Sequence, residues 1–152
     1  MEAAAHLEQH RSSVGATLKP AGLDNSKGLV SDFFLKDPND PRWTDDAGFK
    51  EWVAFMDKYM PGADKSDGGY VAGASLAAMT AHVLKQCGDD LTRENVMKQA
   101  ASLKDLALPM LLPGIAINTS ATNFAPIRQA QLRRFDGERY VPFGPVLTGA
   151  IG

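Results

Sequence analysis

The sequence predicts an α/β fold, and three observations support it. Residues 70–87 form a proline-free stretch that is apolar on almost every helical face, and residues 49–60 carry apolar side chains at helical spacing. Residues 29–35 are short, aromatic and bounded by turn residues, which is typical of a strand. Residues 129–143 contain an Asp-Gly pair between two strand-like segments, which indicates a β-hairpin. We therefore expect about three main helices, a few short strands and a C-terminal hairpin.

The composition limits the classes of partner. A chain of 152 residues suits a single domain with a real core. Its formal net charge of −2 lacks the basic field that nucleic acids require, so we expect no nucleic-acid partner. One cysteine, Cys87, allows no intrachain disulfide, and a buried apolar role is favoured over a catalytic thiol because His82 lies on another helical face.

No targeting or membrane segment is visible in the sequence. Nothing approaches the roughly 18 unbroken apolar residues of a transmembrane helix. Residues 1–10 are acidic and lack the basic and apolar regions of a signal peptide. Taken literally, the chain starts in the cytosol, so a natural short product is expected to be cytoplasmic.

The N-terminal part offers only weak motifs. Residues 1–11 have the composition of a short helix, in which His6 and His10 would share a face and could hold a metal ion. An exposed terminus with two unrelated histidines accounts for them better, so we predict neither a metal nor a cofactor. Residues 12–28 are rich in Gly, Pro, Ser and Asn, which indicates a loop with at most a brief helical turn.

The strand at residues 29–35 leads through a double-proline turn to the first main helix. Asp45 is the expected N-cap, and Pro61-Gly62 ends the helix. The apolar stripe of this helix is expected to form core. Its members are Phe49, Trp52, Val53, Met56, Tyr59 and Met60.

The helix at residues 70–87 is expected to lie between layers, because a helix that is apolar on most sides cannot sit on a surface. Leu76, Met79, Val83 and Cys87 follow one stripe, and Gly88 can close the helix in a left-handed cap.

The next helix is expected to start after Thr92 as N-cap and to run to about Lys104. Asp89 and Asp90 precede it, where carboxylates favour the helix dipole; this explains them better than acid–base catalysis does. Residues 115–118 read as a short extended segment before the hairpin. No nucleophile–base pair or metal set has a persuasive spacing, so an enzyme is not predicted.

The ordered succession of these segments resembles a known family. The segments that carry it are SVGATLKPAGLDNSKGLVSDFFLKDPNDPRW, WVAFMDKYMPG, DGGYVAGASLAAMTAHVLKQCGDDLTRENVMKQAASL and the closing LPGIAINTSATNFAPIRQAQLRRFDGERYVPFGPV. Together they are similar to the C-terminal part of periplasmic substrate-binding proteins of ABC transporters, of the leucine/isoleucine/valine-binding type. Residues 12–152 would be a partial domain of this type I periplasmic-binding-protein fold, and residues 1–11 are unmatched.

The resemblance implies a fold of two α/β lobes joined by three crossovers, with the ligand in the cleft between them. It implies that the helix at residues 70–87 covers a parallel sheet that is largely absent here, so more chain or another subunit would complete it. Tyr70 in GGYVAG matches an aromatic residue that borders the ligand cleft, although a half-buried core tyrosine is an equally good explanation.

Two functions follow from these features. The resemblance implies the partial solute-binding component of an ABC importer for branched-chain or related amino acids or small organic ligands, with a membrane permease as partner and a periplasmic location. The alternative is a truncated remnant or oligomer-forming interaction protein, stable as a homo-oligomer and without ligand binding of its own.

Overall fold

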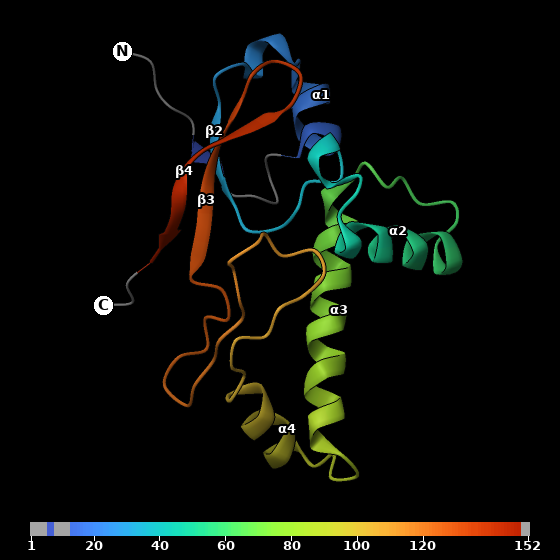
Figure 1. Cartoon of the computed structure of the whole chain (residues 1–152), viewed down its shortest axis with the longest axis vertical. Coiled ribbons are helices and arrows are strands. Elements are labelled where there is room, and N and C mark those ends of the chain that lie inside the picture. The colour runs from blue at the N-terminus through green and yellow to red at the C-terminus, as the bar shows by residue number, and fades with distance from the viewer. Residues whose placement is uncertain (1–5, 8–12, 150–152) are drawn as a thin grey trace.

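The computed structural model describes residues 6–7 and 13–149, which form a mixed α/β structure (Figure 1). The strands are β1 (His6–Leu7), β2 (Val30–Phe33), β3 (Gln129–Phe135) and β4 (Tyr140–Thr148). The α-helices are α1 (Lys19–Ala21), α2 (Ala47–Tyr59), α3 (Gly68–Cys87) and α4 (Arg93–Ala100). Helix α3 runs along the length of the molecule, with the sheet and α2 on opposite sides of its first half in this view. The predicted fold class is confirmed.

The sheet has the order β1-β2-β3-β4. Strand β2 pairs parallel with β1 and antiparallel with β3, and β3 pairs antiparallel with β4. The predicted strand and hairpin are therefore confirmed, although β4 extends to Thr148 and the ladder is irregular between Gln131 and Leu132. The turn differs from the expected two-residue Asp-Gly type. Phe135 pairs with Tyr140, and the Asp136 carboxylate closes the longer loop by accepting the Arg139 amide at 2.9 Å.

The described residues before β2 contain more secondary structure than the sequence suggested. His6–Leu7 is a strand, so the expected helix over residues 1–11 is wrong at these positions, because an open edge of β2 offers them backbone hydrogen bonds. His10 lies outside the described residues. The expected loop contains three short helical turns. These are a π-helix at Val14–Leu18, α1, and a 3-10 turn at Asp24–Ser26.

Helix α2 begins one residue later than predicted, because Asp46 rather than Asp45 is its N-cap. The Asp46 carboxylate accepts the Phe49 amide at 2.8 Å. Trp52 and Met56 are buried as expected. The predicted apolar stripe is wrong at its end, since Tyr59 and Met60 are exposed where the helix extends beyond its neighbours.

Helix α3 starts two residues before the predicted Tyr70, because Asp67 caps it by accepting the Gly69 amide at 2.8 Å. Val71, Val83 and Cys87 are buried, but Leu76 is 60% exposed. The helix is thus covered on one side, and the expected packing between layers is not found within the described residues. Gly88 follows as the C-cap at a positive φ of 58°, but its ψ of −133° lies outside the left-handed helical region, so the predicted left-handed cap is wrong.

Helix α4 has the predicted N-cap, Thr92, whose hydroxyl accepts the Asn95 amide at 3.4 Å. It ends at Ala100, four residues before the predicted Lys104, because the Thr119 side chain forms hydrogen bonds with the backbone at this point. The Thr119 hydroxyl donates to the Ala100 carbonyl at 2.6 Å and accepts the Leu103 amide at 3.0 Å. The expected extended segment at residues 115–118 forms a single bridge, Leu106 to Ile117.

The core has two parts. The larger joins β2, α2, α3 and the segment at residues 103–117, and the smaller joins Val14 and Leu18 to Phe135 and Tyr140 of the hairpin. The buried members of the larger part are Phe33, Leu35, Trp52, Met56, Val71, Val83, Leu103, Met110, Leu111, Leu112, Ile115 and Ile117. Among the helices of the described residues, none is long and apolar enough to span a bilayer.

Candidate ligand site at the start of helix α3

A small polar cavity of about 100 Å³ lies where the first turn of α3 meets the sheet. Gly68 and Gly69 supply its helical wall, and Lys36 and Asp37, just beyond β2, supply another. Arg133 of β3 completes it. The first amides of a helix carry partial positive charge and have no intrahelical acceptor, and here the Asp67 carboxylate, which also lines the cavity, accepts the Gly69 amide, so this end of α3 is polar.

Arg133 is the most buried charge at this cavity. Its side chain is 5% exposed, and Nη1 donates to Asp37 Oδ2 at 3.1 Å. The guanidinium also lies 3.9 Å from the ring centroid of Tyr140 and 5.1 Å from that of Phe33. Burial lowers the pKa of Arg133, and the charge of Asp37 opposes this effect. The two residues therefore form a fixed, desolvated ion pair beside the end of α3.

Lys36, which forms one wall of the cavity together with Asp37, also contacts the start of α2. Its side chain is 7% exposed, and Nζ contacts Asp46 Oδ1 at 2.5 Å and donates to the Pro109 carbonyl at 2.7 Å. One carboxylate thus caps α2 and neutralises a buried lysine. This arrangement holds the end of β2, the start of α2 and the Pro109 segment at fixed positions.

The Asp46 carboxylate makes a testable contribution to acid stability. Its hydrogen bond with Lys36, followed by that with the Phe49 amide, lowers the pKa of Asp46 below its ordinary value. A carboxyl group with a lowered folded-state pKa stabilises the fold above its unfolded pKa of about 3.9, and this contribution is lost as pH falls through the folded value.

We expect Asp46→Asn to cost about 1–3 kcal/mol at pH 7, since asparagine keeps the cap but leaves Lys36 without a counter-charge. The difference from the original protein should shrink as pH falls below about 3.9 and should vanish only below the lowered folded-state pKa of Asp46, where both proteins carry a neutral side chain at this position. Urea denaturation across this pH range measures it. Asp45→Asn is the matched control, because the Asp45 side chain is 97% exposed. A constant difference at every pH would contradict the assignment.

Tyr70, the residue singled out from the sequence, lies in the first turn of α3 beside this cavity. It is partly buried and packs against the larger core cluster, and its amide donates to the Asp67 carbonyl at 3.2 Å. It does not line the small cavity itself, whose helical wall consists of its neighbours Gly68, Gly69 and Val71.

The other candidate groups lie away from this end of α3. His82 contacts Gln86 at 2.8 Å, and Cys87 is buried at the far end of the helix, as its predicted apolar role requires. Asp90 accepts the Thr92 amide at 3.1 Å, and hydrogen bonds from Thr92 lower its pKa. Within residues 6–7 and 13–149, no three His, Cys, Asp or Glu side chains gather as a metal site would require.

Sequence reasoning missed Lys36, Asp37 and Arg133. The sequence contained one signal, since Arg133 and Arg134 are adjacent in a strand, where successive side chains point to opposite faces. One of the two therefore had to face inward and find a carboxylate. Its partner, Asp37, is 96 residues away in the sequence, and local patterns do not reveal such a pairing.

The strand order, the long α3 and the terminal hairpin define the C-terminal portion of a type I periplasmic-binding-protein fold. A solved structure shares it: a branched-chain amino acid ABC transporter protein from Thermus thermophilus with bound valine, at a TM-score of 0.67 and 17% sequence identity. The match covers 84% of this chain and 35% of that one, so the chain spans about a third of its neighbour's length. The resemblance seen in the sequence is confirmed as a fold.

No protein-family model matches the sequence, and a search of curated proteins finds no match either. The likeness therefore rests on the fold.

Proposed function

We propose that this chain is part of the solute-binding component of an ABC importer, with a branched-chain or related amino acid, or another small organic molecule, as ligand. The fold supports this, since the Thermus thermophilus neighbour is a transporter protein crystallised with valine. A membrane permease would be the partner, and a periplasmic location would follow. We propose no catalytic role, and the neighbour is a transport protein rather than an enzyme.

The polar end of α3 is the observation that carries the proposal. It combines the first turn of α3, in which the Asp67 carboxylate accepts the Gly69 amide, with the buried Arg133–Asp37 ion pair, and Tyr70 follows in the same turn. Such an end suits the polar head of an amino acid, while the aromatic ring suits its apolar side chain. Ligand contacts from a second lobe would come from outside this sequence, because the matched region is 35% of the neighbour.

Titration with L-valine and L-leucine, followed by amide NMR shifts, tests the proposal. We expect weak, millimolar binding, because lobe closure around the ligand needs parts that this chain lacks. The shifted amides should cluster around Gly68, Gly69 and Arg133. Shifts centred elsewhere, or none at saturating amino acid, would contradict the proposal. Micromolar binding would contradict the view that the site is incomplete.

Tyr70→Ala is expected to weaken this binding about tenfold, which corresponds to about 1.4 kcal/mol for loss of an aromatic contact. Tyr70→Phe should keep most of the affinity, since the ring supplies the contact. Tyr59→Ala is the control, because that ring is 61% exposed on α2. If Tyr70→Ala binds as well as the original protein, the tyrosine serves the core alone.

A second candidate function is oligomer formation without ligand binding. Leu76 and Leu84 of α3 and Phe124 are exposed apolar side chains, at 60%, 43% and 65% respectively. Such surface favours association. Light scattering after size exclusion distinguishes the two, because a monomer with a cooperative melt would contradict the oligomer and leave the binding proposal standing.

A further inference from the structure

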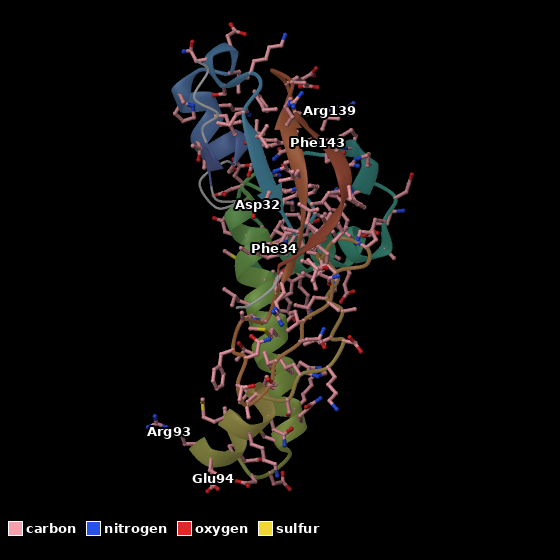
Figure 2. The ribbon with its side chains drawn as sticks, turned by 90° about the vertical axis from the view of Figure 1, so that its left-hand side faces the viewer. Asp32, Phe34, Arg93, Glu94, Arg139 and Phe143 are labelled. Carbon is pink, nitrogen blue, oxygen red and sulfur yellow. The ribbon has the colours of Figure 1, made fainter. Side chains whose placement is uncertain are left out.

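A notch of about 300 Å³ lies between α2 and α3, on the α2 side of the long helix. Its α3 wall consists of small side chains, namely Ala74, Ser75, Ala77, Ala78 and Ala81. A separate groove runs along α3 next to the sheet, and Figure 2 shows Asp32 and Phe34, which line that groove, beside the first half of the helix. The notch therefore occupies a different side of α3 from the face that lies next to the sheet.

The notch combines small side chains with one carboxylate. Alanines on a helix surface allow a second helix to approach to an interaxial distance of about 8 Å. Phe55 of α2 also lines the notch, and its side chain is 45% exposed. Glu51 is the acidic residue of the lining; it is exposed and forms no ion pair within the described residues. Such a notch fits a lysine side chain, which has an aliphatic stem and a terminal positive charge.

Helix α3 itself carries a lysine on the same face as the notch. Ala74, Ala78, Ala81 and Lys85 follow the spacing i, i+4, i+7 and i+11, so they form one helical stripe. Lys85 is exposed, and among residues 6–7 and 13–149 no ion pair joins it to Glu51 or to another carboxylate. One molecule thus presents both a notch that fits a lysine and an unpaired lysine on the same stripe.

We propose that two copies of this chain form an antiparallel dimer through the notch, with a two-fold axis near residues 79–80 of α3. At a rise of 1.5 Å per residue, Ala74 and Lys85 each lie about 8 Å from this axis, on opposite sides of it. Lys85 of one copy therefore lies opposite Ala74 of the other. Its stem covers the alanines and the Phe55 ring, and its ammonium pairs with the partner's Glu51. Two-fold symmetry forms this contact twice.

The same pairing covers the neighbouring exposed stripe of α3. Ala77 and Ala81 are exposed, and Leu84, which follows them at helical spacing, is 43% exposed. The dimer names the partner and the surface of the oligomer considered above as the second candidate function, and it rests on that function. It does not involve the amino-acid site at the start of α3.

Charge reversal, measured by light scattering after size exclusion, tests the dimer. Glu51→Lys places two lysines together at both contacts, and Lys85→Glu places two glutamates there, so each variant alone should raise the dimer Kd at least about tenfold. An equimolar mixture of the two variants restores opposite charges at both contacts and should dimerise as the original protein does.

Glu138→Lys is the matched control, because it makes the same charge change at an exposed position of the hairpin loop. Figure 2 shows its neighbour Arg139 at the opposite end of the molecule from α4, beyond the start of α3. This variant should dimerise as the original protein does. Thermal melts followed by circular dichroism check that each variant is folded. If a reversed variant fails to fold, Glu51→Gln replaces it and should weaken the dimer to a smaller extent.

Three results would overturn the proposal. Single variants that dimerise as tightly as the original protein would show that an oligomer uses another surface. Monomeric variants whose mixture stays monomeric would show that the two charges act within one chain. A monomeric original protein would contradict both this dimer and the second candidate function, whereas the amino-acid titration tests the solute-binding proposal separately.

Discussion

Asp37→Ala is expected to destabilise the protein by about 3–5 kcal/mol, because it removes the carboxylate that is hydrogen-bonded to the buried Arg133 guanidinium. The Arg133 side chain is 5% exposed and that of Asp37 is 15% exposed, so water cannot readily replace the carboxylate. The Tyr140 ring beside the guanidinium offers only partial compensation. Urea denaturation at pH 7, monitored by far-ultraviolet circular dichroism, measures the loss.

The double variant Asp37→Ala with Arg133→Met separates the cost of removing one partner from the net contribution of the ion pair. Replacing both partners by apolar groups is often close to neutral, so this variant should be more stable than Asp37→Ala alone. Asp45→Ala is the control, since its ion pair with Lys50 is exposed and should contribute less than about 1 kcal/mol. A loss below about 1 kcal/mol in Asp37→Ala would mean that Arg133 finds another acceptor.

Elements that depend on neighbouring residues were the ones the sequence could predict. Thr92 caps α4 through its own side chain and the amide three residues on, and the Asp-Gly pair marks the hairpin loop. The apolar spacing in α2 predicts Trp52 and Met56 as core. In each case the decisive contact lies within a few residues, so the local pattern contains the information.

Features that depend on distant residues could not be predicted in this way. The two-residue strand at His6–Leu7 exists because β2 presents a free edge, and helix α4 stops at Ala100 because Thr119 binds its last carbonyl. The exposed side of α3 has the same origin. An all-round apolar helix predicts cover on every side, but only the rest of a fold can provide it.

The candidate site shows the same division. Tyr70 was predicted through a resemblance that extends over most of the chain and stays a prediction, whereas the charges of Lys36 and Arg133 appeared only in three dimensions. The Lys36–Asp46 ion pair forms only when the end of β2 packs against the start of α2. The Arg133–Asp37 ion pair forms only when the end of β2 packs against β3. Each ion pair also restricts the movement of the residues that line the cavity.

The close approach of α2 to the Pro109 segment leads to the second large effect, which is expected for Gly48→Ala. A Cβ at Gly48 would lie 2.2 Å from the Pro109 carbonyl oxygen and within 3 Å of two further backbone atoms. The carbonyl cannot readily move away, because it also accepts the hydrogen bond from Lys36 at 2.7 Å. We expect a loss of about 3 kcal/mol, the upper part of the usual range for overpacking, measured by urea denaturation.

Gly73→Ala in α3 is the matched control, since nothing lies within 4 Å of the position its Cβ would take. Alanine is the better helix former, so this variant should gain about 0.5–1 kcal/mol. The same chemical change is thus expected to have opposite signs at two helical glycines, and only the proximity of Pro109 separates them. If Gly48→Ala also stabilised the protein, α2 would have to sit further from Pro109, and Lys36 could not then bridge Asp46 and the Pro109 carbonyl. The sign at Gly48 therefore tests the geometry that holds this wall of the candidate site.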